Sequence, residues 1–310
     1  MDKNQLIAAI TQMKKEKNAI ILAHYYSDPD IQDICDFLGD SLELARKAAE
    51  TDADIIVFCG VHFMAETASL LSPEKKVIIP AQEAGCSLAD GATAEQLRAW
   101  KAEHPGGLVI SYVNTTAAVK SETDYCCTSA NAQKIVASMP KNTPVVFVPD
   151  NNLGTYISKT QKTGEATDLH MWNGCCHVHQ KITTEVVLEQ LAKYPHAEFL
   201  IHPESQCSHS DEVVNHPRCF MSSTSGMFRH VANSTCTQFV LGTEMGTLHK
   251  MKKDFPDREF IMMRDDLLCE SMKQSTLEAT YIALKEERYV VTVSEDIAER
   301  AALPVKRMLQ

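Results

Sequence analysis

The sequence lacks the features that mark several large classes of protein. No apolar run approaches the roughly 20 residues that a helix needs to cross a bilayer. Residues 1–6 do not show the charged-then-apolar order of a signal peptide. The formal net charge of −11 argues against a general nucleic-acid surface. From these absences we expect a cytoplasmic protein with neither a membrane nor a nucleic acid as partner.

Nucleotide-binding motifs and the local cysteine motifs of metal proteins are also missing. Neither G-x-x-x-x-G-K-[ST] nor G-x-G-x-x-G occurs, so a bound nucleotide is not expected, and there is no C-x-x-C pair. Yet the chain has 11 cysteines, which should not form a disulfide framework in a reducing cytosol. Cys35 and Cys59 have apolar neighbours and are expected to be small core residues. The adjacent pairs at 126–127 and 175–176 would form only strained disulfides.

Three cysteines recur at nearly equal steps: Cys86, Cys176 and Cys269 are 90 and 93 residues apart. Each follows a short apolar run and a few loop residues, which suggests that three thiolates meet on one axis. They are one ligand short of a saturated [4Fe–4S] cluster and would leave one iron open as a Lewis acid. A zinc ion with water as its fourth ligand is the chemical alternative. An open iron predicts a dehydration, or a condensation with loss of water, in which His and Tyr side chains move protons.

The apolar runs repeat with the same period. Each third of the chain has three short, continuous apolar runs, as is typical of parallel strands buried on both faces. The runs are 20–24, 55–58 and 77–80, then 108–112, 145–148 and 169–172, then 199–202, 238–241 and 260–263. Equivalent helical segments are 41–50, 129–137 and 223–231. We predict an α/β protein with three pseudo-threefold-related αβα domains, each with a short parallel sheet, around a central cluster site. One large doubly wound domain is the alternative.

The expected domain boundaries follow the cysteines. We predict a first αβα domain over residues 1–86, a second over 87–176 and a third over 177–274. The C-terminal segment 275–310 should pack back on the first domain. The pattern within this segment predicts a helix over 277–285, a short strand over 289–293 and a final helix over 297–308.

Polar residues stand just past the first strand of each repeat, where open α/β sheets bind ligands. They are His24 and Tyr26, Tyr112 and Asn114, and His202 and Glu204. Hydroxyl residues stand at three helix starts, namely Ser41, Ser129 and Thr224. Helix capping is the default interpretation of such a hydroxyl, but helix N-termini also attract carboxylates and phosphates. Three such ends on one axis would make an anion site within an acidic chain.

Specific short sequences occur from about residue 20 to about residue 275. They include Ala23-His-Tyr-Tyr26, Gly39-Asp-Ser-Leu-Glu-Leu-Ala45, Gly85-Cys-Ser-Leu-Ala-Asp90, Pro149-Asp-Asn-Asn-Leu-Gly154, Trp172-x-Gly-x-Cys-x-Val-His179, His202-Pro-Glu204 and Gly242-Thr-Glu244. Together they make the chain resemble the quinolinate synthase family of bacterial NAD biosynthesis. The resemblance implies a [4Fe–4S] cluster and the condensation of iminoaspartate (iminosuccinate) with dihydroxyacetone phosphate to quinolinate, phosphate and two waters. It also implies functional coupling to L-aspartate oxidase or aspartate dehydrogenase, which supply iminoaspartate.

The resemblance further implies roles for individual residues. Those that resemble cluster ligands are Cys86, Cys176 and Cys269, which makes Cys175 the spare thiol. Those that resemble substrate-binding residues are His24, Ser41, Tyr112, Asn114, Ser129, His202, Glu204 and Thr224. Those that resemble catalytic residues are Glu204, His202, Tyr26 and His179. Among them Glu204 is the candidate general base, and Tyr26 and His179 are candidate proton carriers.

Two features depart from the family pattern. Ser205 follows His-Pro-Glu where many relatives carry Cys, and Cys207 stands two positions later. The stretch 205–221 is longer than usual and is expected to be a surface insertion. Two other functions remain open at this point, namely another iron–sulfur hydro-lyase of the same architecture and a non-catalytic metal-sensing protein.

Overall fold

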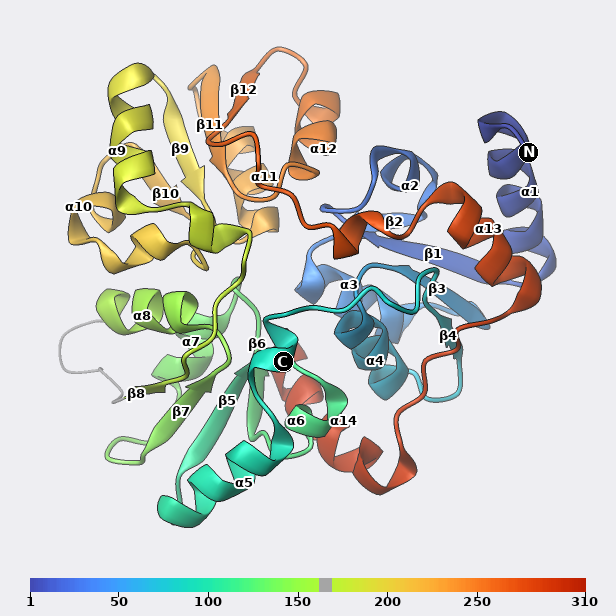
Figure 1. Cartoon of the computed structure of the whole chain (residues 1–310), viewed down its shortest axis with the longest axis horizontal. Helices are drawn as coiled ribbons and strands as arrows, with labels where there is room; N and C mark the ends of the chain where they lie inside the picture. Colours follow the sequence, from blue (N-terminus) through green and yellow to red (C-terminus); the bar gives the residue numbers. More distant parts are fainter. Residues whose placement is uncertain (162–168) are drawn as a thin grey trace.

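Three parallel sheets organise the chain, which the computed structural model describes over residues 1–161 and 169–310 (Figure 1). The first sheet contains β1 (Ala19–His24), β2 (Phe37–Gly39), β3 (Ile55–Cys59) and β4 (Lys76–Ile78). The second sheet contains β5 (Leu108–Tyr112), β6 (Tyr125–Cys127), β7 (Val145–Val148) and β8 (Leu169–Met171). The third sheet contains β9 (Glu198–Ile201), β10 (Cys219–Met221), β11 (Gln238–Gly242) and β12 (Glu259–Met262). Their orders, β2-β1-β3-β4, β6-β5-β7-β8 and β10-β9-β11-β12, are equivalent. The predicted α/β fold of three αβα domains is confirmed, and the single doubly wound domain is wrong.

Helices flank each sheet (Figure 1). The first part of the chain has α1 (Lys3–Glu16), α2 (Pro29–Ile34), α3 (Ser41–Glu50) and α4 (His62–Leu71). The second part has α5 (Ala94–Glu103), α6 (Ala117–Lys120), α7 (Ala132–Ala137) and α8 (Asn151–Thr160). The third part has α9 (Thr184–Lys193), α10 (Asp211–Val214), α11 (Thr224–Asn233) and α12 (Thr247–Asp254). The central strands β3 and β7 are buried along their whole length, because both faces of their sheets are covered. These rigid sheets fix where the carboxyl ends of the strands point.

The edge strands β2, β6 and β10 were not predicted from the sequence. Each has only three residues and has a polar residue on both sides, whereas the equally short β4 and β8 are each followed by a further apolar residue that lengthens the run. Strand β10 lies within 205–221, so the expectation of a surface insertion is wrong. Ser205 and Cys207 are fully buried there, and Cys207 belongs to the apolar core of the third domain.

The helix starts differ from the expected capping pattern. The side chain of Asp40 caps α3 by accepting hydrogen bonds from the backbone amides of Leu42 and Glu43, so Ser41 is already the first helical residue. Ser223 caps α11 and leaves Thr224 in the first turn. Ser129 lies before α7 altogether. None of the three predicted hydroxyl residues is an N-cap, and this leaves their oxygens available for other partners.

The C-terminal segment contains α13 (Leu277–Glu286) and α14 (Glu295–Leu309). Helix α13 packs on α1 and β3, whereas α14 packs on α4, α6 and β6 and so touches both the first and the second sheet layers. The predicted strand 289–293 is wrong. Only Val290 forms a bridge, to Ile78, because Tyr289 has a left-handed backbone conformation (φ 62°) that no strand can continue. The domain boundaries themselves stay a prediction.

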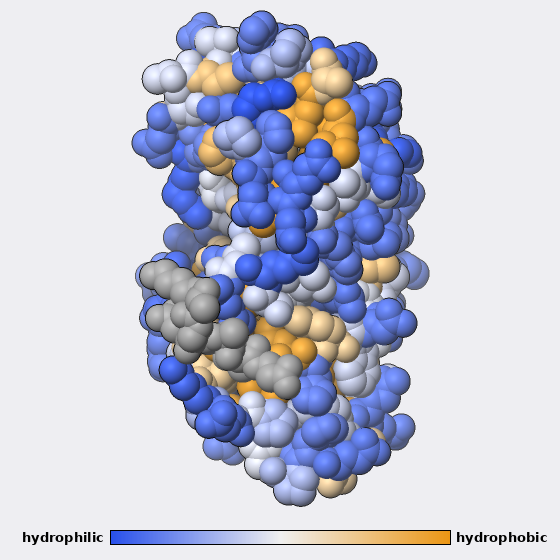
Figure 2. Space-filling view, turned by 90° about the vertical axis from the view of Figure 1, so that its left-hand side faces the viewer, coloured by the Kyte–Doolittle hydropathy of each residue, from blue (hydrophilic) through white to orange (hydrophobic). Residues whose placement is uncertain are grey.

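The side of the molecule formed by the third and second domains is largely hydrophilic, with apolar side chains gathered in small patches (Figure 2). Within the described residues, no helix combines the length and the apolar character needed to cross a bilayer.

Candidate active site

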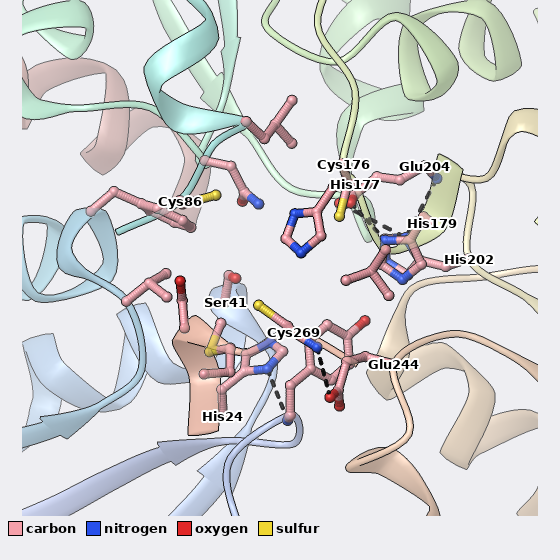
Figure 3. Close-up of a pocket in the computed structure, with 18 of the residues that line it drawn as sticks. His24, Ser41, Cys86, Cys176, His177, His179, His202, Glu204, Glu244 and Cys269 are labelled. Carbon is pink, nitrogen blue, oxygen red and sulfur yellow. Dashed lines mark hydrogen bonds and ion pairs between the residues drawn. The ribbon is translucent and has the colours of Figure 1, made fainter. Parts of the chain in front are cut away.

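A pocket lies where the three domains meet, and Figure 3 shows its walls. All the predicted site residues line it, whichever domain they come from. They are His24, Tyr26, Ser41, Cys86, Tyr112, Asn114, Ser129, Cys176, His179, His202, Glu204, Thr224 and Cys269. Parallel strands place their carboxyl ends at one edge, and the three sheets turn these edges toward one another.

Each domain contributes one thiol to the pocket. Cys86, Cys176 and Cys269 follow β4, β8 and β12, and their sulfurs point into the same space (Figure 3). Cys175, by contrast, is exposed and does not line the pocket. Burial raises the pKa of Cys86 to about 12 and also raises the pKa of Cys176 and Cys269. The thiols therefore sit in a poorly solvated site that favours a nearby cation.

Cys176 belongs to a second group of possible metal ligands. Its Sγ and one ligand atom each of His179 and Glu204 all lie within 4.8 Å of one another. Both His179 and Glu204 are almost fully buried. The thiol side of the pocket is therefore continuous with the buried acid–imidazole cluster.

A chain of buried hydrogen bonds crosses the pocket between domains. Glu204 accepts from the hydroxyl of Tyr112 and pairs with His179 Nδ1 at 2.9 Å. His179 Nε2 lies 3.2 Å from Thr243 Oγ1, which lies 2.8 Å from the hydroxyl of Tyr26. The sequence Tyr112–Glu204–His179–Thr243–Tyr26 thus connects the second, third and first domains, and it offers a path along which protons can shift.

Glu204 and the imidazoles of the pocket have opposite electrostatic surroundings. Burial acts to raise the pKa of Glu204, but His202, His179 and the hydrogen bonds from His179 and Tyr112 outweigh it and lower the pKa to about 2. Burial lowers the pKa of His202 to about 3 and that of His24 to about 4. Within this coupled cluster the hydrogen bonds to Glu204 favour its ionised form, whereas burial disfavours the charged form of the two imidazoles.

The polar atoms on the first and second domain walls are suited to a ligand. His24 Nδ1 accepts the Tyr26 backbone amide at 3.1 Å, which leaves Nε2 for the pocket. Ser129 Oγ lies 3.2 Å from His202 Nε2. The Oδ1 atom of Asn114 is buried and has no hydrogen-bond partner among the residues that the structure describes. A buried acceptor of this kind requires a donor from a bound molecule or water.

The residues that directly follow the three cysteines contact one another. Ser87 Oγ lies 3.2 Å from His177 Nδ1, and His177 Nε2 lies 3.5 Å from Glu270. The side chains of His177 and Glu270 are 48% and 72% exposed, so this contact closes the solvent side of the thiol site.

Several residues of the site were missed from the sequence, among them Asp40, Thr128 and His177 on the pocket wall, and two others stand out. Thr243 connects His179 to Tyr26, and Glu244 lines the pocket as a fully buried acid. Both follow β11 directly, as the predicted residues follow β1, β5 and β9. That position was the available signal, since Gly242-Thr-Glu244 had been matched to the family without roles.

Comparisons with known proteins agree with one another. A family model described as Quinolinate synthetase A protein matches residues 8–310. A quinolinate synthase of Thermus thermophilus is 48% identical over 304 residues, which cover 98% of this chain and 96% of that protein. The quinolinate synthase of Pyrobaculum aerophilum is 46% identical, and the match covers 97% of this chain and 98% of that protein. That of a Nostoc species is also 46% identical, and the match covers 98% of this chain and 93% of that protein.

Gly174, two residues before Cys176, is expected to resist any side chain. A Cβ atom there would lie 2.4 Å from the backbone oxygen of Pro149, which directly follows strand β7. Gly174→Ala should lower the free energy of unfolding by about 1–3 kcal/mol through overpacking, measured by chemical denaturation.

Gly85→Ala is the matched control for that substitution. Gly85 precedes Cys86, and the nearest atom to its added Cβ would be at an ordinary 3.8 Å. Equal stability of the two variants would contradict the contact with Pro149.

Proposed function

The chain belongs to the quinolinate synthetase A family, and on that premise we propose that it condenses iminoaspartate with dihydroxyacetone phosphate to give quinolinate, inorganic phosphate and two waters. Membership makes it an enzyme of NAD biosynthesis. The proposal adds to this the two substrates and the type of reaction, namely a transferase reaction with dehydration and loss of phosphate. The observation that carries it is the convergence of the three predicted thiols and the ten predicted polar side chains, from three domains, on one pocket.

We propose that Cys86, Cys176 and Cys269 hold a [4Fe–4S] cluster. The three sulfurs, all among the described residues, do not form a group within 4.8 Å of one another. Two sulfurs on one zinc ion, each at about 2.3 Å, can be at most about 4.6 Å apart, so the spacing favours a larger metal group. When bound, the cluster supplies an open iron as a Lewis acid that helps a hydroxyl group to leave.

The substrates' anionic groups fit the polar walls of the pocket. His24 and Ser41, at the N-terminus of α3, are the proposed partners of a carboxylate of iminoaspartate, with Asn114 beside them. Ser129 and Thr224 are the proposed hydrogen-bond donors to the triose phosphate. Bound in this way, the enamine carbon of iminoaspartate can displace phosphate from the triose. A proton shift then converts the remaining hydroxyketone to the isomeric hydroxyaldehyde, and the nitrogen closes on that terminal aldehyde carbon with loss of water to give the six-membered ring. The hydroxyl left on the middle carbon is lost as the second water.

The buried hydrogen-bond chain is proposed to move the protons of these steps. Glu204 is the candidate base, and it holds His179 and Tyr112 in fixed orientation. Tyr26 and His179 share Thr243 as a partner, so a proton lost at one end can be replaced from the other. His202 stacks on His179 with ring centroids 4.4 Å apart, and both rings are buried.

An anaerobic assay tests the reaction directly. Iminoaspartate is generated in situ from L-aspartate by L-aspartate oxidase, which is the proposed coupled enzyme. Fumarate is supplied as the electron acceptor in place of oxygen, and dihydroxyacetone phosphate is added. We expect quinolinate and phosphate in equal amounts, measured by mass spectrometry and a phosphate assay. Turnover of hydroxy acids without triose phosphate would instead indicate another hydro-lyase, and a metal-loaded protein without any turnover would indicate a sensor.

The adjacent cysteines give a matched pair for the cluster ligands. Cys176→Ala should lose most of its iron and sulfide and its visible absorption after anaerobic reconstitution, because one of three thiols is gone. Cys175→Ala should retain wild-type iron, because Cys175 is exposed outside the pocket. The reverse result would transfer the ligand role to Cys175.

Glu204→Gln should reduce turnover at least about 100-fold while the iron content stays at the wild-type level, since the amide cannot take a proton. The measurements are initial rate and iron per chain. Glu198→Gln is the control: Glu198 pairs with His230 at 2.7 Å in the same domain but outside the pocket. Near-normal turnover of Glu204→Gln would remove Glu204 as the base.

A further inference from the structure

Glu244 is a fully buried acid for which the mechanism above has no use. One carboxylate oxygen, Oε1, accepts the backbone amide of Cys269 at 3.2 Å. The other, Oε2, accepts the amide of Gly246 at 2.6 Å. These bonds are not helix capping: Gly246 is the N-cap residue of α12, and α12 has no side-chain capping hydrogen bond. The bonds of Glu244 instead fix the loop that carries a proposed cluster ligand.

Lys273 connects this loop to the first domain. Its Nζ atom lies 3.1 Å from Glu244 Oε1 and donates to the backbone oxygen of Tyr26 at 2.6 Å. Lys273 stands four residues after Cys269, at the end of the short 3-10 helix Ser271–Lys273. A single ion pair therefore connects the backbone of a thiol-bearing residue to the backbone of a proposed proton carrier.

The surroundings of the pair leave it little freedom. A Cβ atom on Gly246 would lie 2.7 Å from Lys273 Nζ and 2.8 Å from Glu244 Oε2. The buried amide of Gln32 donates to the backbone oxygens of Tyr25 and Gly246, both at 2.9 Å. Both charges thus occupy fixed positions between the first and third domains.

The second repeat has an acid at the equivalent position. Glu244 stands two residues after β11, and Asp150 stands two residues after β7. Asp150 is also fully buried; its Oδ1 atom accepts the backbone amide of Leu153 at 2.6 Å, and burial raises the pKa of its carboxyl well above the usual range. The equivalent residue of the first repeat is the apolar Val61. A buried acid therefore stands two residues after the third strand in two repeats of three, and in the third repeat it accepts the amide of the pocket cysteine.

We propose that Glu244 and Lys273 are positioning residues. They fix the position of the Cys269 thiol relative to Tyr26 across the boundary between the third and first domains. The proposal rests on the proposed function, since it takes Cys269 as a cluster ligand. A buried carboxylate that accepts two backbone amides restricts the loop before any metal arrives. Partners beyond the direct ligands commonly tune metal affinity in this way.

A double variant separates positioning from mere stability. Lys273→Met alone leaves a buried unpaired carboxylate and should destabilise the fold. Glu244→Gln combined with Lys273→Met removes both charges and should unfold near the wild-type temperature, but the single amide oxygen can no longer accept both backbone amides. Glu198→Gln, with its ion pair outside the pocket, is the control.

The first readout needs no metal. In the cluster-free protein, alkylation of each thiol by a maleimide is followed by peptide mass spectrometry. We expect Cys269 of the double variant to react about 10-fold faster than in the wild type, with Cys86 unchanged, because the loop opens more often when hydrogen bonds to a charged group are lost. Unchanged alkylation of Cys269 would overturn the proposal.

The second readout uses the reconstituted protein. Transfer of iron to a chelator should be about 10–100-fold faster in the double variant than in the wild type or in Glu198→Gln. Wild-type rates in the double variant would overturn the proposal. If the wild type binds iron but forms no quinolinate, the proposed reaction fails, whereas faster alkylation and iron loss would still support the positioning pair.

Discussion

A buried carboxylate has to find partners, and the partners of Glu204 come from different domains. Tyr112 reaches it from the second sheet and His179 from the third, and Thr243 extends the chain to Tyr26 of the first. An ionised acid without such partners would cost several kcal/mol in the interior. The arrangement of the three domains around the pocket therefore depends on this one network, as much as on the apolar cores that each sheet builds for itself.

Much of the fold and of the pocket could be predicted from the sequence, because strands buried on both faces leave continuous apolar runs. Strands such as β3 and β7 gave that signal, whereas the short edges β2, β6 and β10, which have polar residues on both sides, gave none. Ser41 was placed correctly in the pocket but not as a cap, since Asp40 next to it is the better-placed acceptor. The backbone of Tyr289 was beyond pattern analysis, because a left-handed conformation in a tyrosine reflects its tertiary setting. Thr243 and Glu244 were missed because their partners lie far away in sequence.

The three repeats share a scaffold but not their chemistry. Each supplies one thiol after its last strand, yet the residues after the first strands differ: His24 and Tyr26, Tyr112 and Asn114, His202 and Glu204. Two repeats carry an acid after the third strand in chain order, and the first carries Val61. A symmetric pocket could only offer the same contacts three times. Divergence at these positions gives walls of different polarity, which an unsymmetrical pair of small anions requires.

Because each thiol belongs to a different sheet, the pocket exists only in a chain whose three domains are all folded and docked. Any molecule that binds there, whether a metal group or a substrate, adds its binding free energy to the complete native state and to no partly folded one. When one domain unfolds, the binding free energy that the other two domains provide at this site is also lost. Occupancy of the pocket thus couples three sheets, each with its own core, into a single cooperative unit that would otherwise be free to unfold piece by piece.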